Sequence, residues 1–217
     1  SAGGLIRFFV VRGLGSDEPR NDVDGAWVVA TPDNVGRCSA VAWNFAVALR
    51  MRLDRPVGLI VSAVGGSPVE SWIARAALER TAAAPEIWRR HEARLVGYTP
   101  EAVDRHRAAD KQWLSENPTV EQRLRNARSR LPEPYSPAFA HVPVRLYNNR
   151  IHGLAPFALK GILWFQADGN YAAPEEYPEL IQMLITSWRE RWKTQLPFYY
   201  VELNNMRVRQ QELHDER

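Results

Sequence analysis

The stretch Val57 to Glu70, VGLIVSAVGGSPVE, decides the fold of this chain. Its first five residues are apolar on both faces of an extended chain, which is typical of a short central strand in a parallel sheet covered by helices. A turn at Gly65 and Gly66 follows, and Ser67 and Glu70 then stand at the spacing of a capping box that opens a helix. The stretch therefore predicts a strand, a glycine turn and a helix in direct succession.

Strands and helices are predicted on both sides of this stretch. Short β-branched and aromatic runs are typical of strands, and apolar residues at helical spacing are typical of helices packed on one face. The alternation of the two along the chain predicts a doubly wound α/β sheet. The predicted strands are Leu5 to Val11, Ala26 to Ala30, Leu159 to Phe165 and Phe198 to Leu203, and the predicted helices are Ser39 to Leu53 and Tyr177 to Trp192.

A charged, alanine-rich segment, residues 82–131, interrupts this pattern. Pro85, Pro100 and Pro118 each stand where a new helix could begin, because proline suits the first helical turn. We therefore expect three helices here, which form a lid or insertion in a single domain covering residues 1–217. Arginines alternate with acidic residues in this segment, and that pattern is typical of a solvated helical surface.

The composition argues against several classes of protein. The net charge is +3, but the basic residues are mixed with acids and carry no RNA-binding or helix-turn-helix signature, so we expect no nucleic-acid partner. The single cysteine, Cys38, excludes a disulfide framework and a cysteine-rich metal site. No apolar run approaches the roughly 20 residues of a membrane span, and Ser1 opens no signal-like segment. We expect no metal, no cofactor and no membrane contact.

Polar residues follow two of the predicted strands. In an open parallel sheet, ligands bind outside the carboxyl ends of the strands. The first strand end offers the backbone N–H groups of Gly65 and Gly66, and the second offers Gln166, Asp168 and Asn170. Together these groups could form an oxyanion hole with polar contacts to a substrate. The alternatives are that the two glycines serve only a tight turn and that the second group caps the following helix.

The chain offers no convincing nucleophile or base at these strand ends. Ser16, Ser62 and Ser67 each have an ordinary structural explanation, as a turn residue, a strand end and a helix cap. His152 lies beside an apolar run, where a histidine is more often a hydrogen-bonded packing residue than a catalytic one.

Two longer blocks carry a resemblance to a known family. They are VGLIVSAVGGSPVESW (57–72) and LYNNRIHGLAPFALKGILWFQADGN (146–170), and a third, at 17–27, fits upstream of them. In this order they resemble the sialate O-acetylesterases, carbohydrate esterases of the SGNH-hydrolase type. The resemblance implies a flavodoxin-like three-layer sandwich with a parallel sheet, and ester hydrolysis by a Ser, His and Asp constellation. Members of the family are often exported, and a single cysteine is compatible with export.

The same resemblance implies roles for individual residues. Gly66, or its neighbour Gly65, matches the oxyanion glycine of the family, and Asn170 matches its oxyanion asparagine. Gln166 and Asp168 match the Q and E of the family's QGE.N segment, so they are expected to contact substrate. The implied activity is hydrolysis of acetyl esters on sialic acid or a related sugar without any cofactor, and the implied partner is an acetylated carbohydrate.

Two parts of the family pattern have no counterpart in the chain. The early G-Q-S-N segment, which carries the nucleophile, is missing, and the last residues, His214 to Arg217, supply no D-x-x-H segment for the base. We therefore expect a chain that is incomplete at both ends or a diverged relative. The alternative function is a non-catalytic carbohydrate-binding or scaffold protein that has lost the triad. A flavin or nucleotide binder is disfavoured because the chain has no phosphate loop or G-x-G-x-x-G segment.

Overall fold

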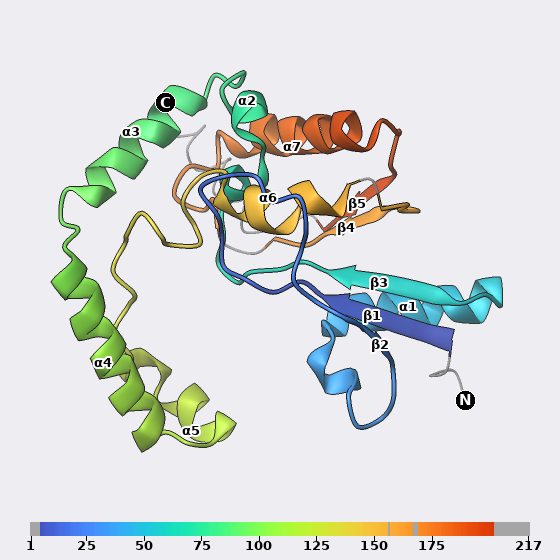
Figure 1. Cartoon of the computed structure of the whole chain (residues 1–217), viewed down its shortest axis with the longest axis horizontal. Helices are drawn as coiled ribbons and strands as arrows, with labels where there is room; N and C mark the ends of the chain where they lie inside the picture. The colour runs from blue at the N-terminus through green and yellow to red at the C-terminus, as the bar shows by residue number, and fades with distance from the viewer. Residues whose placement is uncertain (1–4, 156, 167–168, 202–217) are drawn as a thin grey trace, which may run out of the picture. The chain divides into compact units, whose positions relative to one another are not determined.

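The computed structural model describes residues 5–155, 157–166 and 169–201 (Figure 1). Their internal contacts group the chain into two units. One unit combines residues 1–85 with 140–217, and the other consists of residues 86–139. The assignment of 82–131 as an insertion in one esterase domain stays a prediction.

The first sheet lies in the first unit and has the order β2-β1-β3. Strands β1 (Ile6–Val10) and β3 (Val57–Val61) run parallel with Ile6 opposite Val57, and β2 (Trp27–Val29) pairs antiparallel on the other side of β1. Helix α1 (Ala40–Leu53) joins β2 to β3 and packs on the sheet. Its predicted start is confirmed, since the Ser39 side chain accepts a hydrogen bond from the Ala42 N–H. The core of this sheet consists of Ile6, Phe8, Ala30, Ala46 and Leu59.

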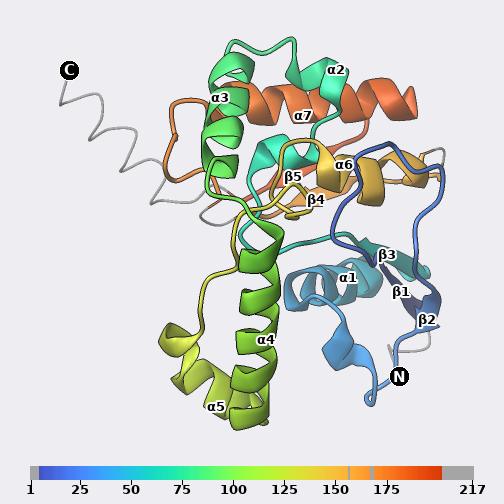
Figure 2. The same cartoon turned by 60° about the vertical axis from the view of Figure 1, so that its left-hand side comes forward.

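The second sheet pairs β4 (Ile162–Trp164) with β5 (Phe198–Tyr200) in parallel. Helix α7 (Tyr177–Trp192) connects the two strands and lies beside the short helix α2 (Arg75–Leu78) in both views (Figure 1, Figure 2). The Trp188 ring centroid is 6.1 Å from that of Trp164 and 5.9 Å from that of Phe198. The aromatic stripe of α7 therefore belongs to the core, as its helical spacing predicts.

The fold is mixed α/β, but the described strands do not form one continuous parallel sheet. A doubly wound sheet predicts that the apolar runs 57–61 and 159–165 are neighbouring or near-neighbouring parallel strands, but β3 and β4 lie in separate small sheets, and β2 runs antiparallel to β1. Both parallel pairs nevertheless have a helix between their strands in the sequence, which is the βαβ arrangement that the sequence predicts.

Helix α6 (Arg145–Arg150) is buried at every position. It ties down the loop after β1, because the Asn148 side chain donates to the Asp17 carbonyl at 2.7 Å and Arg150 Nε donates to the Gly13 carbonyl at 2.7 Å. The 3-10 helix η5 (His152–Leu154) follows directly. The sequence analysis did not predict α6, since a short helix buried on all sides shows no amphipathic period. The first unit also contains η2 (Val35–Arg37) and η3 (Val69–Trp72).

The second unit is helical. Helix α3 (Ala84–Leu95) leads into it, and α4 (Pro100–Glu116), α5 (Val120–Arg125) and η4 (Ala127–Ser129) follow. Thr99 caps α4 just before Pro100, and Thr119 forms a capping box with Gln122 just after Pro118. The three helices predicted from the prolines are therefore confirmed, since each proline lies within two residues of a helix start.

Candidate functional site

The turn after β3 supplies one side of the candidate site. Gly66 has a φ of +71°, a conformation that glycine adopts without a steric penalty. Ser67 does not cap a helix, so the capping-box prediction is wrong. Its hydroxyl donates to the Val64 carbonyl at 2.7 Å and accepts from the Trp72 indole at 2.9 Å. Since this hydroxyl is engaged by Trp72, the chain forms the four-residue 3-10 helix η3 without a side-chain cap.

The turn after β4 supplies the other side. Asn170 Oδ1 accepts from the Val69 N–H at 2.9 Å and from Gln166 Nε2 at 2.7 Å. Asn170 Nδ2 donates to the Glu70 carboxylate at 2.9 Å. The side chains of two strand exits, about a hundred residues apart in sequence, therefore meet within hydrogen-bonding distance.

This network fixes which way the Asn170 amide points. Two N–H donors face its oxygen and a carboxylate faces its nitrogen. The reverse orientation would place the amide nitrogen against the two donors and the amide oxygen against the carboxylate. The side chain is only 5% exposed. An amide nitrogen carries two hydrogens, and Glu70 accepts only one of them. The arrangement therefore preorganises a second N–H of Asn170 that Glu70 does not use.

Gly169 lets the two turns approach each other closely. A Cβ at this position would overlap the Ser67 carbonyl oxygen and would lie 2.8 Å from Gln166 Nε2. The glycine between Asp168 and Asn170 is thus required by packing, because any side chain would push the two turns apart.

The structure describes only one of the two residues predicted to contact substrate, Gln166 and Asp168. Gln166 is buried, and its Nε2 donates to Asn170 Oδ1 and, at 3.3 Å, to the Ser67 carbonyl. It therefore supports Asn170 from within, and a direct contact with substrate stays a prediction. Asp168 lies outside the described residues. Gly65 and Gly66 lie where the sequence predicts, in the turn that precedes η3.

Two features of this cluster were not predicted from the sequence. One is the contact of Glu70 with Asn170, and the other is the presence of His141. Nε2 of His141 lies 3.0 Å from the Gly65 carbonyl oxygen, and the His141 carbonyl accepts from Ser71 Oγ at 3.0 Å. His141 stands in an irregular stretch before α6, so no periodicity or strand end points to it. A contact that joins Gly65 to a residue 76 positions away leaves no local signal in the sequence.

Ser16 and Ser62 lie where the sequence predicts, in a turn and at the end of β3, whereas Ser67 is not the helix cap that was expected. Ser16 Oγ donates to the Glu18 carbonyl at 2.7 Å, and Ser67 is engaged by Val64 and Trp72. Ser62 Oγ is buried and has no partner within the described part of the chain. None of them is therefore assigned as a nucleophile, which would need an adjacent base.

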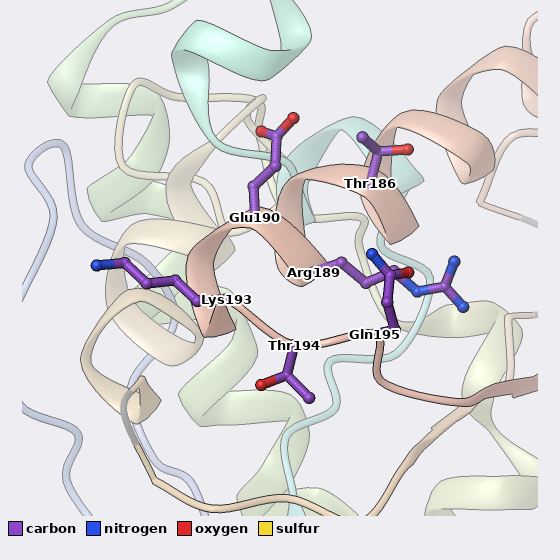
Figure 3. Close-up of a pocket in the computed structure, with 6 residues that line it drawn as sticks. All are labelled: Thr186, Arg189, Glu190, Lys193, Thr194 and Gln195. Atoms are coloured by element: carbon purple, nitrogen blue, oxygen red, sulfur yellow. The ribbon is translucent and has the colours of Figure 1, made fainter.

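Other features lie apart from this cluster. A cavity of about 470 Å³ at the end of α7 is lined by side chains of both charges and shares no residue with the Asn170 cluster (Figure 3).

Within residues 5–155, 157–166 and 169–201, no three His, Cys, Asp or Glu side chains gather as metal ligands. None of the helices described there is long and apolar enough to cross a membrane.

Comparison with known proteins agrees with the resemblance of the sequence blocks. The sialate O-acetylesterase of Rattus norvegicus is 27% identical over 218 residues, which cover 92% of this chain and 37% of that protein. That of Mus musculus is 28% identical over 198 residues, covering 85% of this chain and 33% of that protein. The chain resembles the sialate O-acetylesterases. It spans about a third of the length of these relatives, and no protein-family model matches it.

A solved structure shares the fold. A carbohydrate acetylesterase from Xanthomonas citri superposes with a TM-score of 0.64 and is 23% identical in sequence. The match covers 98% of this chain and 40% of the other. The arrangement of helices and strands described above is therefore one that a known acetylesterase contains.

Proposed function

We propose that the protein containing this chain is a carbohydrate O-acetylesterase, which cleaves acetyl esters from sialic acid or a related sugar by serine-type acyl transfer. The observation that carries the proposal is the contact between the two strand exits, in which Asn170 is held against the residues that follow Gly66. The similarity to sialate O-acetylesterases over most of the chain supports the substrate class.

In this proposal the chain supplies the oxyanion side of the reaction. A serine hydroxyl attacks the ester carbonyl carbon while a base takes its proton, and the carbonyl oxygen gains negative charge. The Gly66 N–H and the Asn170 amide donate to that oxygen. The sugar alcohol leaves with the proton, and water then attacks the acetyl-enzyme, releases acetate and restores the serine.

The cluster around Asn170 fits this role for a physical reason. Donors that are already oriented stabilise a developing charge without reorganising during the reaction. Glu70 and the Val69 N–H hold the Asn170 amide from both ends, and burial keeps water from competing for it. A residue that only capped the next helix would not need partners on the opposite turn.

The test uses the natural full-length protein, because the chain spans only part of its relatives. Acetate release is measured from an O-acetylated sialic acid and from an O-acetylated neutral sugar. Our proposal predicts turnover of at least one, with preference for the sialic acid. Binding of either sugar without acetate release would instead support the non-catalytic carbohydrate-binding alternative.

A further inference from the structure

The Ser67 hydroxyl closes the Gly65-Gly66 turn by donating to the Val64 carbonyl at 2.7 Å, but this bond does not reach the peptide between the two glycines. Within 4 Å of a Cβ at Gly65 there is no heavy atom outside its chain neighbours, so packing does not fix this part of the turn. Two consecutive glycines also have the widest choice of backbone angles of any residue pair. Among the described residues, no backbone carbonyl accepts a hydrogen bond from the Gly66 N–H. Some other contact must therefore set the direction of this N–H.

His141 makes a contact that sets this direction. Its Nε2 lies 3.0 Å from the Gly65 carbonyl oxygen. A carbonyl oxygen only accepts hydrogen bonds, so Nε2 must carry the hydrogen and donate it. The ring is itself placed through its backbone, since the His141 carbonyl accepts from Ser71 Oγ in η3.

The Gly65 carbonyl and the Gly66 N–H belong to the same peptide unit. That unit is planar and trans, so its C=O and N–H point in opposite directions. A hydrogen bond that holds the oxygen on one side therefore fixes the N–H on the other. Rotation of this peptide, the easiest motion of a Gly-Gly turn, would break the contact with His141. The same contact polarises the peptide and makes its N–H a stronger donor.

We propose that His141 is a positioning residue, which orients the Gly65-Gly66 peptide so that the Gly66 N–H faces the acyl oxygen of the substrate. This inference rests on the proposed function, because it concerns the donor that would stabilise the oxyanion. His141 does not touch the reacting atoms in this role and acts only through the peptide bond.

Kinetics of the natural full-length protein test the role. His141→Ala should lower kcat by about 10-fold, less than the loss of a whole oxyanion donor, and should leave KM within about 2-fold. His141→Gln should recover most of kcat, since its amide N–H can reach the same carbonyl. His91→Ala is the matched control, because His91 Nδ1 lies 2.6 Å from the Tyr135 hydroxyl in the other unit.

A second measurement tests the same contact without catalysis. In a ¹H–¹⁵N spectrum of the folded protein, the Gly66 amide resonance should move in His141→Ala and stay near its wild-type position in His141→Gln. Equal kcat in wild type and His141→Ala, or equal losses in the Ala and Gln variants, would overturn the inference. A wild-type protein that releases no acetate while the Gly66 resonance responds as expected would count against the proposed function instead.

Discussion

Gly169 is the residue at which the closeness of the two turns can be tested most simply. Gly169→Ala should lower the free energy of unfolding by about 1–3 kcal/mol, because the new Cβ would overlap the Ser67 carbonyl oxygen. Gly65→Ala is the matched control, since its Cβ would meet nothing within 4 Å, and its effect should stay within about 0.5 kcal/mol. Urea unfolding midpoints of the three proteins give the comparison. Equal stability of Gly169→Ala and wild type would mean that the turns are not packed as described.

Single residues of the site were predictable only where a strand end marked them. Asn170 and the two glycines follow apolar runs, and the rule that ligands bind at the carboxyl ends of parallel strands singles them out. His141 has no such mark, because its relation to the turn depends on how a distant irregular segment folds back. The partner of Glu70 was also missed, since the spacing of a capping box favoured a local bond over one to Asn170.

The pairing of η5 with α7 gives a prediction at the scale of elements. Arg191 of α7 donates to His152 Nε2 at 3.2 Å, so the neutral ring carries its hydrogen on Nδ1. Burial, together with the charge of Arg191, lowers the pKa of His152 below its ordinary value of 6.5. The unfolded chain therefore binds more protons than the folded one once the pH falls through about 6.5, and the folded state loses stability there.

The effect of His152 is measured against His152→Gln, which cannot titrate. The difference in unfolding free energy between wild type and variant should shift against the wild type as the pH falls from 7.5 to 5.5. Other titrating groups contribute to both proteins and largely cancel in this difference. A difference that is independent of pH, or that moves in favour of the wild type, would contradict the lowered pKa.

Helices with a cap or an amphipathic period were predicted closely, and helices with neither were not. The predictions agree with the structure for α1, for α7 and for the three helices that begin near Pro85, Pro100 and Pro118. They succeed because caps and periodicity are local properties of the sequence. Helix α6 has neither, since every one of its residues is buried. The predicted helix after Gly66 became the 3-10 helix η3, because the Trp72 indole bonds the hydroxyl that would have capped it.

The pairing of strands across the whole molecule was the least predictable part. The sequence marks Val57 to Val61 as a strand, but it does not say which strand lies beside it, since pairing joins residues that are far apart in the chain. The structure pairs β3 with β1 and β4 with β5 and shows no bridge between the two sheets in the described residues. The polar exits of β3 and β4 meet all the same, through the hydrogen bonds of Asn170 with Val69 and Glu70.

We also predict the esterase activity of the 217-residue chain when it is assayed by itself. It should hydrolyse p-nitrophenyl acetate no faster than a denatured control, because no serine among the described residues is hydrogen-bonded to a base that could activate it. Robust turnover that is abolished by Ser62→Ala or Ser67→Ala would show that one of these serines is the nucleophile. Release of p-nitrophenolate, followed by absorbance, is the measurement.

The most direct test of the account is the effect of Asn170→Ala on acetate release by the natural full-length protein. The variant loses three hydrogen bonds, two that join the two turns and one to Gln166 within the turn after β4, so its free energy of unfolding should fall by about 1–3 kcal/mol. Thr81→Val, which removes a buried hydroxyl bonded to the Leu78 carbonyl in another part of the unit, controls for lost stability alone. We predict that kcat of Asn170→Ala falls by about 100-fold to 1,000-fold with KM nearly unchanged, while Thr81→Val keeps its kcat. An Asn170→Ala protein that is destabilised but fully active would contradict the assignment of Asn170 to the oxyanion hole.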